Sequence, residues 1–170
     1  MASITSLHLQ HTRELFFAER SRREAIRGSL STPVAAISFS VFALSTLSVE
    51  IDLARWQHFS SAVIMLLAVG AVAALLASAY QVVMSEWLFV YHEPPRLPDL
   101  LDGDAAHTAD EEEARVRGIL ASSYAVAYEQ YLKGNAISAR RRTWALRLIL
   151  LALLLEAAAF VILPFHRAGF

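Results

Sequence analysis

A glutamate inside an apolar segment is the residue of this sequence that most clearly could take part in chemistry. Glu156 lies slightly past the middle of the stretch 144–163, which is almost wholly Leu, Ala, Ile, Val and Phe. A carboxyl group at such depth in a membrane helix costs at least about 2.5–3.5 kcal/mol, and it is a functional-site hypothesis by default. Arg147 lies nine positions earlier, on the opposite face of a helix that turns about 100° per residue. Glu156 therefore needs a partner on another helix, a water-filled cavity or a proton.

Serine hydroxyls of an earlier apolar stretch are the candidate partners. Ser38, Ser45 and Ser48 form a roughly heptad-spaced polar stripe, and the depth of Glu156 corresponds to residues 42–46 of that stretch. Two interpretations remain open. Either Glu156 and these serines line a polar lumen or proton-sensing site, or a neutral Glu156 hydrogen-bonds to a serine and holds the helices together.

The sequence contains no signature of an enzyme. It has no P-loop, G-x-S-x-G, H-E-x-x-H or dinucleotide-binding motif. Its six histidines are scattered, and without cysteine it has no disulfide, thiolate metal site or cysteine nucleophile. A net charge of −1 argues against nucleic-acid binding. We expect no catalysis, no cofactor, no metal and no nucleic-acid partner.

The composition indicates a membrane protein. Hydrophobic residues make up 56 % of the 170 residues and charged residues 18 %, against about 25 % charged residues in an average soluble domain. The mean hydropathy is +0.43. Three stretches, about 31–49, about 60–84 and 144–164, are each long enough for a spanning helix of about 20 residues. We expect an all-α membrane protein with three transmembrane helices, plus N-terminal and central cytoplasmic helices, that forms oligomers.

The distribution of arginine sets the expected orientation, because short cytoplasmic loops carry the excess of basic residues. Basic residues concentrate before the first span and between the second and third spans. The connection between the first and second spans contains only Arg55, and the segment after the third span contains only Arg167. The expected parts are a cytoplasmic charged helix (1–30), a transmembrane hairpin (31–85), a cytoplasmic Pro linker and helix (86–143), the third transmembrane helix (144–164) and an external tail (165–170). The arginines expected at the inner membrane surface are Arg140, Arg141, Arg142 and Arg147.

Two cytoplasmic helices are expected. Residues 9–29 mix acidic, basic and apolar side chains, and Thr108 with Glu111 forms a capping box that starts a second helix. That second helix either ends or bends near Gly134, or it runs on into the third span. Its tyrosine stripe packs against residues 9–29 or a neighbouring subunit, or it forms a ligand site. The aromatic residues expected at this interface are Phe16, Phe17, Tyr124, Tyr128 and Tyr131.

A small-residue pattern marks the second span. Gly70, Ala74 and Ser78 recur every four residues, and such a pattern allows two membrane helices to approach closely. We expect this face to contact the first span or a second subunit.

The order of these segments is similar to that of a known group of membrane proteins. The sequence R-E-L-F-F-A-E-R-S-R-R-E precedes a two-span hairpin, the linker Tyr91-His-Glu-Pro-Pro-Arg-Leu-Pro and a Tyr-rich helix follow, and a basic stretch ending at Arg142 leads into the last span. This layout resembles small bacterial inner-membrane proteins of anti-phage defence operons, among them the two-span SLATT-type effectors that are predicted to form pores when a partner senses infection. The third span departs from the two-span pattern. The resemblance implies a membrane-disrupting or membrane-sensing role with a cytosolic partner.

We therefore expect a homo-oligomeric effector in the bacterial inner membrane, with its N-terminus in the cytoplasm and its C-terminus outside. It would permeabilise or depolarise that membrane in anti-phage defence, triggered through a cytosolic protein or signal. The alternative is a membrane sensor or anchor that detects membrane perturbation and recruits or releases a cytosolic effector without forming a pore. In both cases the expected partners are the lipid bilayer, further copies of the chain and a cytosolic protein.

Overall fold

The regular structure of this chain is α-helical. The computed structural model describes residues 6–51, 58–87, 89, 91, 93–95 and 109–168. No strand occurs among these residues, and the helices are α1 (Ser6–Gly28), α2 (Ser31–Glu50), α3 (Phe59–Trp87) and α5 (Ala109–Arg167). The expectation of an all-helical fold is confirmed.

Three helices are long and apolar enough to cross a membrane. α2 has 20 residues and α3 has 29, and the third apolar stretch forms the C-terminal part of α5. Since a helix rises about 1.5 Å per residue, about 20 residues suffice to cross the hydrocarbon core of a bilayer. Length and composition thus indicate a membrane protein.

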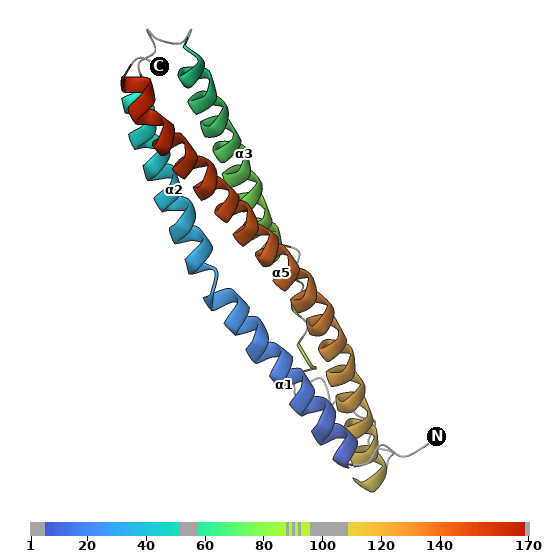
Figure 1. The fold of residues 1–170 in the computed structure, drawn as a ribbon. Coiled ribbons are helices and arrows are strands. Elements are labelled where there is room, and N and C mark those ends of the chain that lie inside the picture. Colours follow the sequence, from blue (N-terminus) through green and yellow to red (C-terminus); the bar gives the residue numbers. More distant parts are fainter. Residues whose placement is uncertain are drawn as a thin grey trace. The chain divides into compact units, whose positions relative to one another are not determined.

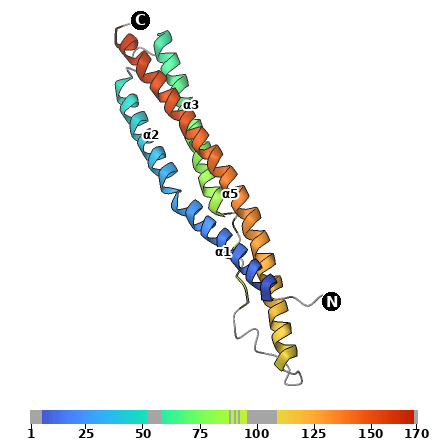
Figure 2. The same ribbon diagram turned by 60° about the horizontal axis from the view of Figure 1, so that its bottom comes forward.

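The chain folds as two compact units, each with its own buried core. The first unit comprises Met1–Arg27 and Leu88–Ser138, and the second comprises Gly28–Trp87 and Ala139–Phe170. In the first unit α1 lies along the N-terminal part of α5 (Figure 1). In the second unit α2, α3 and the C-terminal part of α5 run side by side (Figure 2). The helix α5 thus contributes residues to both units.

Buried positions in the second unit follow a heptad spacing. On α2 the buried residues Pro33, Ser40 and Leu47 are seven positions apart. On α5 the spacing alternates between four and three, and the buried residues are Ala145, Ile149, Ala152, Glu156, Ala159, Leu163 and His166. This spacing keeps one face of each helix toward its neighbours, as in left-handed bundles of membrane helices.

Large apolar side chains cover the outside of the second unit, and its interior combines alanine and serine with buried leucine and isoleucine. The exposed set includes Phe39, Phe42, Leu66, Val69, Leu76, Leu150, Leu154 and Val161. The core between α3 and α5 is built largely from alanine. Lipid chains solvate the large side chains as well as a protein core does, so close approach of small residues drives helix packing instead.

The first unit has an aromatic core. Phe16 of α1 and Tyr131 of α5 are buried together with Phe89 and Ala127. The rings of Phe16 and Tyr131 lie 5.4 Å apart edge to face, and those of Phe89 and Tyr131 lie 5.2 Å apart. Of the alternatives left open for the tyrosine stripe, packing against residues 9–29 is therefore present within the chain.

The helix α5 continues through Gly134 and Asn135, where an end or bend was one expectation. The Asn135 side chain is bonded to α1 instead of competing for the backbone of its own helix. Asp110, Glu111 and Glu112 lie in the first turn of α5, where acidic groups favour the positive end of the helix dipole. Thr108 of the expected capping box lies outside the described residues.

Candidate functional site

The Glu156 carboxyl group forms a buried polar contact between α5 and α2. Glu156 is 3 % exposed and Ser40 is fully buried. The Ser40 hydroxyl donates a hydrogen bond to Oε1 of Glu156. The alanines at positions 152 and 159 of the same heptad series lie on either side of the carboxylate along α5. One interpretation of the sequence was a serine hydrogen-bonded to Glu156, and such a bond is present.

The three serines expected beside Glu156 lie on another face of α2. Ser38, Ser45 and Ser48 are all exposed. Each donates a hydrogen bond to a backbone carbonyl of α2, at 3.0, 2.9 and 2.7 Å respectively. Ser38 and Ser40 are two positions apart, which separates their side chains by about 200° around a helix. The structure thus does not bring these three serines together with Glu156 within one chain.

Ser40 was not predicted from the sequence because the partner of Glu156 was sought by its depth along the first span and not by the face of the helix on which it lies. The depth estimate pointed to residues 42–46, whereas the contact is made at position 40. The available signal was the heptad spacing of Ser40 from the apolar residues Pro33 and Leu47, with Ile37 and Leu44 between them in the packed face.

A second buried polar contact, which sequence analysis did not identify, lies at the C-terminal end of α5. His166 is 2 % exposed, and its Nδ1 atom lies 3.3 Å from Oγ of Ser60 and 3.3 Å from Oγ of Ser61. The neighbouring Arg167 pairs with Glu50 of α2. These contacts join the end of α5 to the start of α3 and the end of α2. The signal for His166 was its place in the heptad series of α5.

Within the chain, the small-residue stripe of α3 packs on α5, and Ile37 and Leu44 of α2, the first span that was one expected partner, pack against the same core. The Ser78 hydroxyl donates a hydrogen bond to the carbonyl of Ala145 at 3.0 Å. A β-carbon added at Gly70 would lie 3.2 Å from Cδ1 of Leu155, and Ala74 is buried in the core shared with α5. The physical reason is that the absence of large side chains lets the two helices approach until a serine reaches a backbone carbonyl.

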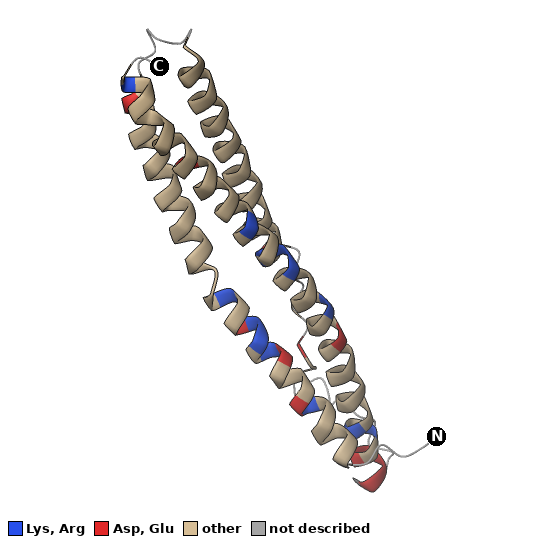
Figure 3. Cartoon of the chain, viewed as in Figure 1, with Lys and Arg blue, Asp and Glu red and all other residues tan. Residues whose placement is uncertain are grey.

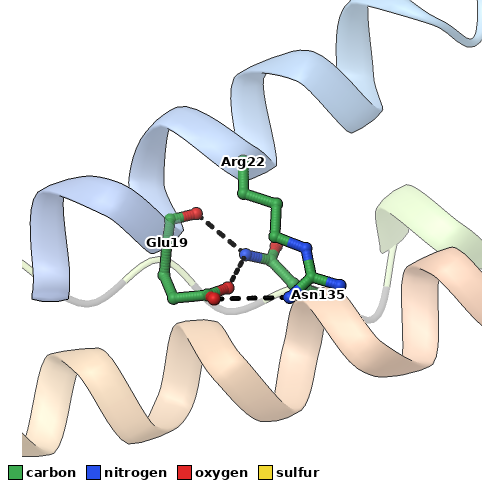
Figure 4. Close-up of polar contacts among 3 residues, drawn as sticks. All are labelled: Glu19, Arg22 and Asn135. Carbon is green, nitrogen blue, oxygen red and sulfur yellow. Dashed lines mark hydrogen bonds and ion pairs between the residues drawn. The ribbon is translucent and has the colours of Figure 1, made fainter.

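In the first unit, Asn135 joins α5 to α1 (Figure 4). Its Nδ2 atom donates hydrogen bonds to the backbone carbonyl of Glu19 and to Oε2 of Glu19, both at 2.8 Å. Arg22 donates to Oε1 of the same carboxylate at 3.3 Å. Asn135 is fully buried. A buried polar side chain between two packed helices fixes their register, so this contact helps to set how α1 lies along α5.

Arg23 is a buried cation stacked on an aromatic ring. It is 2 % exposed, its guanidinium carbon lies 3.8 Å from the centroid of Phe89, and Nη1 donates to the Ser138 hydroxyl at 2.8 Å. A β-carbon added at Gly134 would lie 2.6 Å from the ring of Phe89. A desolvated cation–π contact contributes about 2 kcal/mol. Sequence analysis missed this cluster, since its members are far apart in the chain and only the glycine inside a helix pointed to it.

The aromatic residues expected at a partner interface differ in exposure. Phe16 and Tyr131 are 1 % and 3 % exposed, and Phe17 is 45 % exposed. Tyr124 and Tyr128 are half-buried. Burial raises the pKa of the Tyr131 phenol above its ordinary value. Of the five, Phe17 thus presents a large free surface, and it borders an open groove of about 690 Å³ between α1 and α5.

The four arginines expected at the membrane surface all lie on α5 within the second unit. Arg140 and Arg147 are exposed, and Arg141 and Arg142 are half-buried. Arg141 donates to Oε1 of Gln81 at 3.3 Å. Acidic and basic residues otherwise concentrate on α1 and the N-terminal part of α5, while α2 and α3 carry few (Figure 3).

No protein-family model, curated protein or solved structure matches this chain. Among the described residues, no group of three His, Asp or Glu side chains is placed to hold a metal ion.

Proposed function

We propose that this chain is a membrane effector that assembles with further copies of itself and permeabilises or depolarises the membrane. The observation that carries the proposal is the contrast between two faces of α2. One face carries Ser40 and packs inside the chain. The other carries Ser38, Ser45 and Ser48, which are exposed. Each of these hydroxyls donates to a backbone carbonyl of α2, and its oxygen can still accept a hydrogen bond from another helix or from water, which lipid chains do not supply.

Three spanning helices are too few to enclose a water-filled path, so a pore needs several copies. Copies related by rotation close into a ring. In our proposal each copy turns the serine face of α2 toward the ring axis, where the hydroxyls replace part of the hydration shell of a passing ion.

In this proposal the contact between Ser40 and Glu156 holds the closed state by keeping α2 against α5. It joins the inner face of α2 to α5 in the middle of the bundle. Breaking it frees α2 to move relative to α5, and that movement changes the width of the path. The trigger acts on the first unit, because α1 directly precedes α2 in the sequence and α5 has residues in both units.

The setting we propose is the bacterial inner membrane, with the N-terminus and residues 86–143 in the cytoplasm. The resemblance in layout to small membrane proteins of anti-phage defence operons supports a defensive role. A cytosolic partner that senses infection is then the proposed trigger, and Phe17 with the adjoining groove is the proposed contact surface.

The test is the membrane potential of bacteria that express the chain, read with a voltage-sensitive dye at matched protein levels. We expect wild type to depolarise the membrane when its operon partner is present and phage is added. Replacing Ser38, Ser45 and Ser48 together by leucine should return the signal to background, and Glu156→Leu should alter it while oligomers still form on cross-linking. Phe39→Leu, at an exposed position outside the serine face, is the matched control and should behave as wild type.

A wild-type protein that leaves the potential unchanged under phage challenge would contradict the pore. The alternative, a sensor or anchor that recruits a cytosolic effector, is favoured by the groove beside Phe17. In that case deletion of 108–133 should abolish protection from phage, and Glu156→Leu should affect stability alone.

A further inference from the structure

Arg140, Trp144 and Arg147 form an outward stripe on α5 in the second unit. Their spacing of four and three positions places them on one face of a helix. Trp144 is 48 % exposed, and both arginines are exposed. The guanidinium carbon of Arg147 lies 5.3 Å from the ring centroid of Trp144. The stripe therefore presents two cations with an aromatic ring between them.

Five other arginines in the described part of the chain pair with a carboxylate, and the two arginines of this stripe do not. Arginines elsewhere form these ion pairs: Arg20–Glu24, Arg22–Glu19, Arg115–Glu112, Arg117–Glu113 and Arg167–Glu50. Within the described part of the chain, neither Arg140 nor Arg147 forms an ion pair with a carboxylate. Their positive charge is therefore available to an anion from outside the chain.

The surroundings of Arg147 indicate that the anion is the phosphate of a lipid headgroup. Its neighbours on the outside of α5 are the exposed apolar residues Leu146, Leu150 and Leu151. This arginine thus lies where the apolar stretch begins, the depth at which lipid headgroups meet the acyl chains. A guanidinium group matches a phosphate with two parallel N–H donors, and tryptophan concentrates at the same depth.

The opposite side of α5 is held in place at this level. The Ala145 carbonyl accepts a hydrogen bond from Ser78, and Arg141 donates to Gln81. Because both partners belong to α3, the contacts fix the rotation of α5 and keep the stripe facing outward.

We infer that Arg140, Trp144 and Arg147 bind the phosphate group of an anionic phospholipid. Two cations beside one phosphate favour a lipid with net negative charge, since the choline or ammonium group of a zwitterionic lipid already balances its own phosphate. A basic side chain near an anionic surface contributes roughly a fivefold preference. The site does not depend on whether the chain forms a pore.

The test uses Trp144 as its own reporter. The chain has three tryptophans, so Trp56→Phe with Trp87→Phe leaves Trp144 alone. The full-length protein is placed in vesicles that mix phosphatidylglycerol with phosphatidylcholine, with bromine on the acyl chains of one lipid at a time. Bromine quenches a nearby indole, and unbrominated vesicles correct for changes in intrinsic emission. We expect brominated phosphatidylglycerol to quench Trp144 several-fold more effectively than its share of the lipid predicts.

Substitutions at the two arginines, with one control substitution elsewhere, test whether the preference belongs to this site. Arg140→Gln and Arg147→Gln should each lower the preference in part, and the double variant should abolish it. Arg115→Gln, which removes an arginine that is paired with Glu112, should leave it unchanged. Arg147→Lys, which keeps the charge and loses the paired donors, should give an intermediate value.

Equal quenching by the two lipids in the wild type would overturn the site, and so would an equal loss in Arg115→Gln. Loss of the preference on adding inorganic phosphate, but not on adding chloride at the same ionic strength, would assign the stripe to soluble phosphate instead of lipid. If the glutamine variants fail to fold by circular dichroism, the wild type still decides, because a bound phosphate predicts a preference for phosphatidylglycerol that falls as chloride rises.

Discussion

Serine hydroxyls of α2 occupy two environments that differ by half a turn of the helix. Ser40 faces inward and donates to Glu156, whereas Ser38 and Ser45 face outward and donate to their own backbone. A hydrogen bond between membrane helices is worth about 0.6–2 kcal/mol. The backbone bonds instead leave the outer hydroxyls satisfied until a second helix or water arrives, which is the condition that a pore lining needs.

Tyr131 offers a test of packing in the first unit through its titration. Its burial beside Phe16 and Phe89 raises the pKa of its phenol above the ordinary value. The folded state then holds the phenolic proton more tightly than the unfolded state. The contribution to stability is complete below the unfolded pKa of about 10 and is lost as pH rises through the folded pKa.

The difference between the titrations of the wild type and Tyr131→Phe gives the phenolate absorbance of Tyr131. We expect this absorbance to appear at a higher pH than that of the other tyrosines. The measurement is an ultraviolet titration of both proteins in detergent micelles between about pH 9 and 12. An unfolded control in denaturant should lose the delay. A Tyr131 signal that coincides with that of the other tyrosines would contradict the buried aromatic core.

At the scale of the helix, α5 uses one continuous heptad series for several kinds of contact. In the first unit the series carries Tyr131, Asn135 and Ser138, and in the second it carries Glu156 and His166. Four of these members meet a polar group on a neighbouring helix: Asn135 meets Glu19, Ser138 meets Arg23, Glu156 meets Ser40 and His166 meets the Ser60–Ser61 pair. An apolar series of the same period would permit several registers, and the polar members select one.

Two glycines of α5 provide a matched pair for testing this packing. Gly134→Ala places a methyl group 2.6 Å from the ring of Phe89, whereas nothing lies within 4 Å of a β-carbon at Gly118. We expect Gly134→Ala to destabilise the first unit by about 1–3 kcal/mol. Gly118→Ala should stabilise it by about 0.5–1 kcal/mol, because alanine is the better helix former.

Thermal unfolding in micelles, followed by near-ultraviolet circular dichroism of the aromatic core, measures both variants. Arg23 lies on Phe89, so the ring has little freedom to move away from a new methyl group. Equal stabilisation by the two substitutions would show that Phe89 does not lie against α5.

At the scale of the whole molecule, charge and apolar surface are divided between the two units. The charged residues concentrate on α1 and the N-terminal part of α5 (Figure 3), and most of the exposed large apolar side chains belong to the second unit. Since short arginine-rich segments remain on the cytoplasmic side, we predict that residues 1–30 and 86–143 lie inside. The connection between the first two spans and the segment after the third span then lie outside.

The absence of cysteine makes this orientation directly measurable. A membrane-impermeant maleimide added to intact spheroplasts should label His58→Cys and Ala168→Cys. It should label Ser6→Cys and Glu129→Cys only after the membrane is permeabilised. All four positions are exposed, so accessibility within the fold does not bias the comparison. The reverse labelling pattern would invert the orientation, and labelling of all four would mean that the chain does not cross the membrane as proposed.

The sequence by itself determined the helices and the three apolar segments, because helix period and hydropathy are local properties. It also singled out Glu156 and the packing of the tyrosine stripe, since a carboxyl in an apolar helix and an aromatic face each require a partner. Which groups meet was decided only by the tertiary structure. The choice of Ser40 over Ser38, of α5 over α2 as the partner of Gly70, and of Phe89 as the ring under Arg23 depends on the relative rotation of helices. Within each unit that rotation results from many packed side chains together, and residues far apart in the chain set it.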